Sequence, residues 1–138
     1  MRIHGLCHCG NISFAFETKE TLPTIAPRAC DCSFCTMHAA QCYSDPHGSV
    51  LIDVREGTLL QRYRFGERTA DFLLCRSCGA YAGAVITQGD VQRATLNLRL
   101  TPLRDVPAAP VSYRSETRDE RIARRLARWT PARLVIKG

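Results

Sequence analysis

The sequence of 138 residues predicts one mainly β domain that spans residues 1–138. Three observations lead to this fold class. Apolar and polar residues alternate in several short segments, turn-forming residues separate these segments at short intervals, and eight cysteines lie in clusters that can cross-link distant strands. A content of 45% hydrophobic and 23% charged residues excludes collagenous, coiled-coil and disordered chains.

Two segments show most clearly the period-two alternation of a half-buried strand. In ISFAFE, Ile12, Phe14 and Phe16 share one face. In LLQRYRF, the face turned to the core would hold Leu59, Tyr63 and Phe65. Further short strands are expected at 50–54, 70–75, 80–86, 94–100 and 134–136. A turn at 45–48, with the sequence DPHG, would separate two of these strands.

One helix is predicted near the C-terminus. Thr117 and Glu120 have the spacing of a capping box, and Pro131 would stop the helix. Its apolar face would hold Ile122, Leu126 and Trp129. The helix would also carry four arginines, Arg121, Arg124, Arg125 and Arg128. Before it, the proline-containing segment 101–110 is expected to wrap the surface rather than to separate two domains.

Basic residues are concentrated in the C-terminal segment 113–138. The chain has 19 Lys and Arg against 13 Asp and Glu, a formal balance of +6. This segment alone holds eight basic and three acidic side chains, a balance of +5. An arginine-rich helix face can bind phosphates, but solvated faces of this kind are common. We therefore do not expect nucleic acid as a partner.

The sequence shows no membrane or export signal. No apolar run approaches the roughly 18 residues that cross a bilayer. The N-terminal segment MRIHGLCHCGN has neither the apolar core nor the small-residue cleavage site of a secretory signal. We expect no membrane association and a cytoplasmic chain whose thiols stay reduced.

The cysteines form three clusters, GLCHCG, CDCSFC and LLCRSCGA, with Cys42 apart from them. In a C-x-C pair the two sulfurs lie too close along an extended chain for an unstrained disulfide, whereas both can turn to one metal ion. Gly10 and Gly79 each follow a cysteine pair, and a positive φ there lets backbone N–H groups approach the sulfurs. The spacing therefore favours metal over cystine.

The clusters divide naturally into four and three cysteines. The cysteine quartet comprises Cys7, Cys9, Cys75 and Cys78, a closed shell typical of a structural zinc. The cysteine trio comprises Cys30, Cys32 and Cys35, which would leave one coordination position open. We expect two zinc ions per chain, with the trio open to partial occupancy. Sulfur shells do not exclude iron, but nothing else in the sequence indicates an electron carrier.

The three clusters, in this order, resemble the glutathione-dependent formaldehyde-activating enzyme family, which includes centromere protein V. The resemblance covers about residues 3–100, and an N-x-R run at Asn97–Arg99 adds to it. It implies an Mss4-like β-tent of short antiparallel sheets around a structural zinc. It also implies a structural role for the quartet and an exchangeable or catalytic role for the trio. Asp31, Thr36, Met37 and Leu74 depart from the family pattern, and the first three surround the open metal position.

Four further residues have more than one interpretation, and a fifth, His8, has one. Cys42 is a small buried side chain, or else a fourth ligand or resolving thiol. His38 is a surface or capping residue, or else a ligand or general base. His8 points away from the quartet. Asp31 faces solvent or orients a neighbouring group. Arg99 faces outward from a strand or pairs with a substrate carboxylate.

The trio and the resemblance together predict a zinc-dependent carbon–sulfur lyase similar to S-hydroxymethylglutathione synthase. Cys30, Cys32 and Cys35 would carry the chemistry, and the partner would be a small thiol or aldehyde. Glutathione and formaldehyde enter through the resemblance alone. The alternative is a non-catalytic zinc module that binds a macromolecule. A third possibility is a sensor whose trio loses its metal on oxidation.

Overall fold

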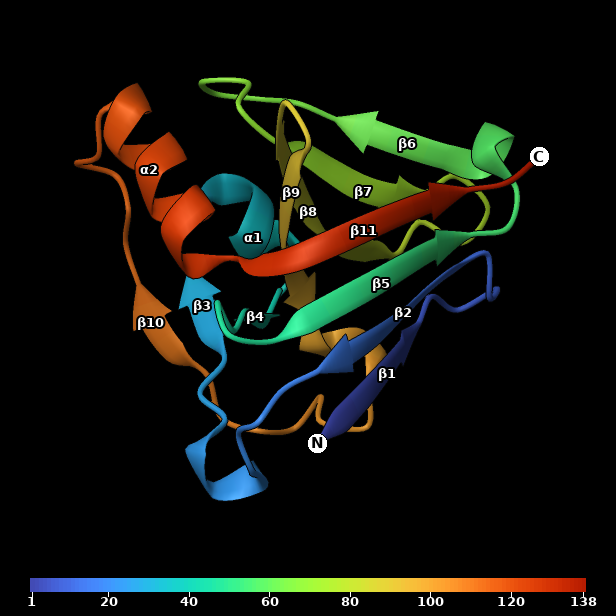
Figure 1. Cartoon of the computed structure of the whole chain (residues 1–138), viewed down its shortest axis with the longest axis horizontal. Coiled ribbons are helices and arrows are strands. Elements are labelled where there is room, and N and C mark those ends of the chain that lie inside the picture. The colour runs from blue at the N-terminus through green and yellow to red at the C-terminus, as the bar shows by residue number, and fades with distance from the viewer.

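The computed structural model describes residues 1–138 as a mainly β fold with two helices (Figure 1). The strands are β1 (Arg2–Leu6), β2 (Ile12–Glu17), β3 (Arg28–Cys30), β4 (Cys42–Tyr43), β5 (Ser49–Val54), β6 (Leu60–Tyr63), β7 (Asp71–Cys75), β8 (Tyr81–Gln88), β9 (Val91–Asn97), β10 (Ala109–Val111) and β11 (Thr130–Ile136). The helices are α1 (Ser33–Met37) and α2 (Arg118–Arg128). The predicted fold class, mainly β with one long C-terminal helix, is confirmed.

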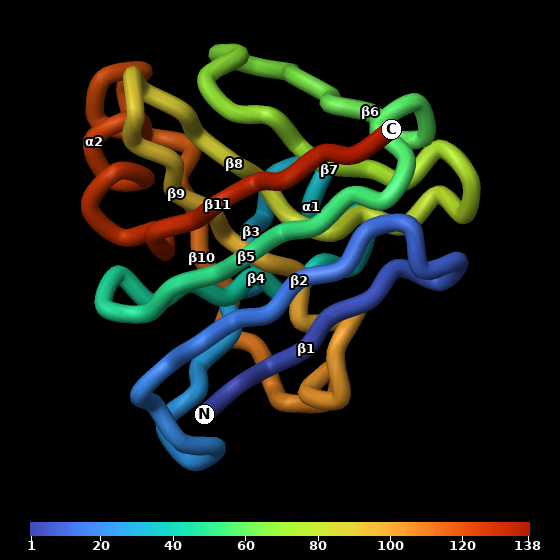
Figure 2. Tube along the Cα trace, turned by 45° about the vertical axis from the view of Figure 1, so that its right-hand side comes forward, coloured from blue at the N-terminus to red at the C-terminus, as the bar shows by residue number.

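Strand β11 joins two sheets. Residues 132–136 pair with β5 in parallel, and residues 130–131 pair with β9 in the antiparallel sense. One sheet therefore runs β1-β2-β5-β11, whose strands lie side by side in Figure 2. The other is built around β9, with β8, β7 and β6 on one side and β4, β3 and β10 on the other. Two sheets that share a strand enclose a common core, an arrangement consistent with a β-tent.

Parallel pairing occurs at two places where the sequence predicts only antiparallel sheets. Strand β11 lies parallel to β5, and β10 lies parallel to β3. Both pairs join segments far apart in the chain, as parallel strands require because their connection must cross from one end to the other. The proline-containing segment thus ends in a strand, at Ala109–Val111, rather than only wrapping the surface.

The core confirms the face predicted for ISFAFE. Ile12, Phe14 and Phe16 are at most 3% exposed and pack with Ile52 and Leu96 between the two sheets. A second, smaller cluster around Phe34, Phe72, Tyr81 and Trp129 lies beside α1 and α2. This second cluster carries the site described below.

The face predicted for LLQRYRF is only partly right, because Phe65 packs against the second core cluster but Leu59 is not a core residue. Leu60 is buried, with 8% of its surface exposed, whereas Tyr63 is 44% exposed. Strand β6 is an edge strand that pairs only with β7, where Leu60 lies opposite Cys75. The pairing with β7 buries Leu60 at the start of this strand, and the sequence pattern does not reveal it.

Helix α2 has the predicted bounds and cap. The Thr117 hydroxyl accepts a hydrogen bond from the Glu120 N–H at 3.2 Å, and the Glu120 carboxylate accepts one from the Thr117 N–H at 2.9 Å. Trp129 follows the last turn and is buried. No helix in the structure combines the length and the apolar character that crossing a membrane requires.

We expect Gly5→Ala to destabilise the first sheet. Gly5 lies opposite Phe14 in the β1–β2 pair, and an added Cβ would overlap the Phe14 ring. Overpacking of this kind costs about 1–3 kcal/mol of unfolding free energy, which urea denaturation would measure. The penalty should shrink in a Phe14→Leu background, because the ring that causes the overlap is gone. An equal penalty in both backgrounds would contradict this account.

Candidate metal centres and the adjoining pocket

The cysteine quartet is assembled from two turns. Cys7 and Cys9 follow β1, and Cys75 and Cys78 lie at the end of β7 and in the turn after it. The four Sγ atoms lie within 4.8 Å of one another, with 3.8 Å between Cys7 and Cys9 and 3.5 Å between Cys9 and Cys75. Zn–S bonds of about 2.3 Å in a tetrahedron give S–S separations of about 3.8 Å. The quartet therefore fits one tetrahedral ion, and none of the cysteines is disulfide-bonded.

The backbone of both turns supports charged sulfurs. Gly10 and Gly79 adopt φ angles of 88° and 80°, and their N–H groups donate to the carbonyls of Cys7 and Cys75 at 3.0 and 2.8 Å. The Ile12 N–H donates to Cys7 Sγ at 3.2 Å. N–H groups directed at sulfur spread the negative charge of a thiolate shell. The two glycines thus have the role that the sequence predicts for them.

The thiol pKa values in the quartet reflect the same backbone groups. The Asn11 N–H lowers the pKa of Cys9. Burial raises the pKa of Cys78, but the N–H groups of Ala80 and Cys9 outweigh it and bring the value to about 6. Cys75, where burial dominates, has a pKa raised to about 11. The quartet thiols therefore differ in their pKa values. A divalent ion binds thiolates, so its binding would release the protons of all four thiols.

The cysteine trio lies around α1. Cys30 ends β3, Cys32 caps the first turn of α1 and Cys35 lies within the helix. The three Sγ atoms lie within 4.8 Å of one another, and the Cys35 N–H donates to Cys32 Sγ at 3.3 Å. Hydrogen bonds from Cys30 and Cys35 lower the pKa of Cys32 to about 2. Contacts with Cys30, Cys32 and Cys42 raise the pKa of Cys35. The Cys32 thiolate and the two neighbouring sulfurs together form a set of donors that could bind a metal ion.

Cys42 and His38 lie beside the trio without joining it. Cys42 is buried in the second core cluster, and its thiol falls outside the metal-binding group. A hydrogen bond from Cys35 lowers its pKa, and the charge of Arg28 acts in the same direction. His38 is the C-cap of α1, with Nδ1 at 2.9 Å from the Phe34 carbonyl. This agrees with a capping role for His38 and a packing role for Cys42.

The remaining sequence candidates have distinct positions. His8 is exposed between the quartet cysteines. Arg99 donates to the backbone carbonyls of Ala39 and Arg104 at 2.9 and 3.1 Å, so it braces a loop. Asp31 Oδ2 forms an ion pair with Arg114 at 3.2 Å and lines the pocket described next. Asp31 adjoins the trio in this pocket, and Arg99 lines a second hollow together with Cys30 and Cys35.

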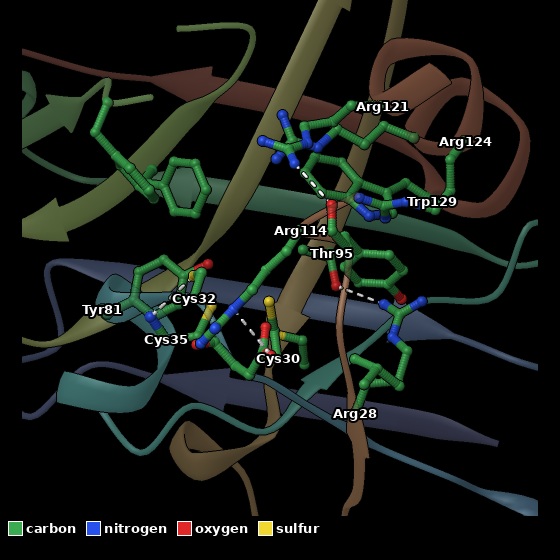
Figure 3. A pocket seen from close by; sticks show the side chains of 17 residues that line it. Arg28, Cys30, Cys32, Cys35, Tyr81, Thr95, Arg114, Arg121, Arg124 and Trp129 are labelled. Carbon is green, nitrogen blue, oxygen red and sulfur yellow. Dashed lines mark hydrogen bonds and ion pairs between the residues drawn. The ribbon is translucent and has the colours of Figure 1, made fainter. Parts of the chain in front are cut away.

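A pocket of about 120 Å³ lies against the trio. In Figure 3 the cysteines lie on one side of it, and Arg121 and Arg124 of α2 on the other. The aromatic residues in its wall are Phe65, Phe72, Tyr81, Tyr113 and Trp129. The five arginines in its wall are Arg28, Arg114, Arg121, Arg124 and Arg125. The trio therefore opens onto a partly enclosed, positively charged pocket.

Three arginines of α2 line this pocket, namely Arg121, Arg124 and Arg125, whereas Arg118 and Arg128 are exposed to solvent. Arg121 and Arg124 are 22% and 18% exposed and pair with Glu116 at 3.5 and 2.7 Å. The Arg124 guanidinium lies 3.5 Å from the centre of the Tyr113 ring. Arg125 donates to Thr69 Oγ1 at 2.7 Å, and burial lowers its pKa to about 10. Charge and helical period alone could not distinguish this arrangement from a solvated helix face.

Comparison with known proteins supports the fold. No protein-family model matches the chain, and no curated protein matches it. Among solved structures, the chain is similar to a Rhodobacter sphaeroides protein whose crystal structure came from a structural genomics programme. The two share 29% sequence identity over 78% of this chain and 97% of the other, with a TM-score of 0.55. The description of that structure names no activity, so the similarity bears on architecture alone.

We expect protein purified without chelator to contain two metal equivalents per chain, measured by elemental analysis. Cys32→Ser should leave one equivalent, because it removes a ligand only from the trio. Cys42→Ser should retain both, because its thiol belongs to neither group. One equivalent in the wild type, or two in Cys32→Ser, would contradict the division into quartet and trio.

The two sites should differ in their effect on stability. The quartet joins segments 66 residues apart between Cys9 and Cys75, whereas the trio closes a local turn. Structural zinc supplies on the order of 10 kcal/mol of folding free energy in small domains. We expect Cys75→Ser to lose most of its stability and Cys35→Ser to lose a small part, measured by thermal denaturation. Equal melting temperatures would overturn this assignment.

Proposed function

We propose that the chain is a zinc-dependent enzyme of the carbon–sulfur lyase class that acts on adducts of a small thiol and an aldehyde. The observation that carries this proposal is the contrast between the two cysteine groups. The quartet is a complete shell of four sulfurs, whereas the trio has three and adjoins a pocket. Closed shells are typical of structural zinc and open ones of catalytic zinc.

The proposed reaction joins or separates a thiol and a carbonyl compound. In the forward direction the sulfur attacks the carbonyl carbon, a C–S bond forms, and the thiol proton passes to the carbonyl oxygen. Zinc held by Cys30, Cys32 and Cys35 would bind the thiol as thiolate or polarise the carbonyl. Breakage of the adduct reverses these steps and returns both reactants unchanged in oxidation state.

The residues around the trio fit such an adduct. The Tyr81 side chain is 2% exposed and lines the pocket, and its ring packs against Phe34 of α1. Phe65, Phe72 and Trp129 form apolar parts of the wall. Apolar walls keep water from a labile adduct and strengthen the electrostatic interactions inside the site.

The resemblance to the glutathione-dependent formaldehyde-activating family gives the proposal its candidate substrates. The three cysteine motifs that carry the resemblance are the segments that build the quartet and the trio. Glutathione and formaldehyde are therefore the first pair to test. The proposed metal shells need reduced thiols, which the cytoplasm maintains, and we propose that compartment.

The direction of the α2 arginines supports an enzyme over a module that binds a macromolecule. Arg121, Arg124 and Arg125 all line the pocket, and Glu116 pairs with the first two. Arginines that bind a nucleic-acid backbone instead form an exposed stripe along a face. A small molecule can reach these guanidinium groups, whereas a duplex presents its phosphates only to an outer surface.

The test follows exchange between free thiol, aldehyde and adduct by NMR. Zinc-loaded protein should accelerate exchange of S-hydroxymethylglutathione, and Cys32→Ser should reduce the rate to that of the uncatalysed reaction. Ser49→Ala is the matched control, because Ser49 is exposed on β5 and belongs neither to the pocket nor to either cysteine group. Equal rates for wild type and Cys32→Ser would refute the proposal. Micromolar, salt-dependent binding of DNA or RNA would favour the macromolecule-binding alternative.

A further inference from the structure

Four buried side-chain polar atoms in this chain lack a hydrogen-bond partner, and all four belong to residues that line the pocket beside the trio. They are Asp31 Oδ1, Tyr81 Oη, Arg121 Nε and Arg125 Nε. A buried polar atom without a partner destabilises the fold, and buried polar atoms normally have one. Three of the four are donors, and one of these, Arg121 Nε, lies 3.5 Å from Glu116 Oε1 in an ion pair. The other two donors, Tyr81 Oη and Arg125 Nε, lack an acceptor.

Two arginines in the wall have no carboxylate partner. Arg125 donates to Thr69 Oγ1, and its guanidinium lies 4.9 Å from the centre of the Trp129 ring. Arg28 donates to the hydroxyls of Ser44 and Thr95 at 2.7 and 3.1 Å. The other three lining arginines pair with Asp31 or Glu116. Arg28 and Arg125 remain as positive charges with only neutral neighbours as partners.

The charge balance of the pocket stays positive even with a metal in the trio. Five arginines against the carboxylates of Asp31 and Glu116 leave a surplus of three. A divalent ion with three thiolates carries one negative charge, which reduces the surplus to two. Buried charge without compensation is costly, so the pocket is suited to a ligand with one or two negative charges.

Tyr81 connects the arginine side of the pocket with the trio. Its ring packs edge-on against Phe34, which lies between Cys32 and Cys35 in α1, with 4.8 Å between ring centres. Burial and then the nearby thiols raise the pKa of Tyr81, whereas the charge of Arg125 lowers it. The Tyr81 hydroxyl is thus within electrostatic range of the trio thiols and of Arg125. Figure 3 shows Tyr81 beside Cys32 and Cys35.

We propose that this pocket binds the oxyanion group, a carboxylate or a phosphate, of a small ligand, with Arg125 and Arg28 as countercharges and Tyr81 as a neutral donor. Guanidinium groups bind both oxyanions through charge-assisted hydrogen bonds. A volume of about 120 Å³ holds several water-sized groups. The pocket would thereby favour anionic thiols over neutral or cationic ones as ligands of the trio. This selectivity rests on the proposed function.

The first test measures anion binding without any thiol. Trp129 is the only tryptophan in the chain and lines the pocket, so its fluorescence should change saturably as inorganic phosphate or propionate is added at constant ionic strength. The anion that binds with the lower dissociation constant shows whether the pocket prefers a phosphate or a carboxylate. Because Arg125 contacts Trp129, isothermal titration calorimetry provides a second readout for its variants.

Three variants separate binding from structure. Arg125→Gln should raise the dissociation constant about tenfold or more. Arg118→Gln is the matched control, since its side chain lies on the same helix, is 59% exposed and is absent from the pocket. Tyr81→Phe removes a hydroxyl that bonds to nothing in the protein, so it should weaken anion binding several-fold without lowering the melting temperature. Equal affinities in Arg125→Gln and Arg118→Gln, or no saturable binding by wild type, would overturn the proposal.

The second test compares three thiols of similar length in the adduct exchange assay. We expect 3-mercaptopropionate to react faster than 2-mercaptoethanol, cysteamine to react slowest, and Arg125→Gln to remove this order. Equal rates for the three thiols would overturn the selectivity while the proposed function stands. Anion binding with no exchange for any thiol would refute the proposed function while the oxyanion site stands.

Discussion

Seven thiols gathered in two small volumes impose the main constraint on this structure. Ionised sulfurs within 4.8 Å of one another repel, so each group can hold several thiolates only with a cation that takes up the charge. In the quartet, that requirement ties the turn after β1 to the turn after β7. In the trio, it ties β3 to α1. The quartet offers four sulfurs to an ion, whereas the trio offers three and adjoins a pocket.

The sequence predicts those elements whose signals are local. The alternation in ISFAFE, the capping box at Thr117 and Glu120, and the spacing within each cysteine cluster all act within a few residues, and the structure contains each of them. The burial of Leu60 in β6 depends on pairing with the next strand, and the parallel position of β11 depends on a strand far along the chain. Leu60 rather than Leu59 is buried because Leu60 lies opposite Cys75 of β7.

The same distinction holds for the candidate site. The sulfurs are visible in the sequence because metal ligands recur at fixed spacings. Tyr81, Arg28 and Arg125 carry no such signal. Tyr81 lies in an apolar strand and reads as an ordinary core residue, while Arg125 lies on a helix whose charged face could equally well be solvated. Only the packing of α2 over the trio shows that their polar atoms meet in one partly enclosed pocket.

The position of β11 between the two sheets bears on how the chain is made. Every ligand of the quartet has been synthesised by residue 78, whereas β11 begins at Thr130. Until β11 leaves the ribosome, β5 has β2 on one side and a bare edge on the other, with Leu51 among its exposed residues. Unpaired edges of this kind recruit strands from other chains. The nascent protein therefore passes through an interval in which the four quartet cysteines can already bind a metal ion while one edge of β5 is still unpaired.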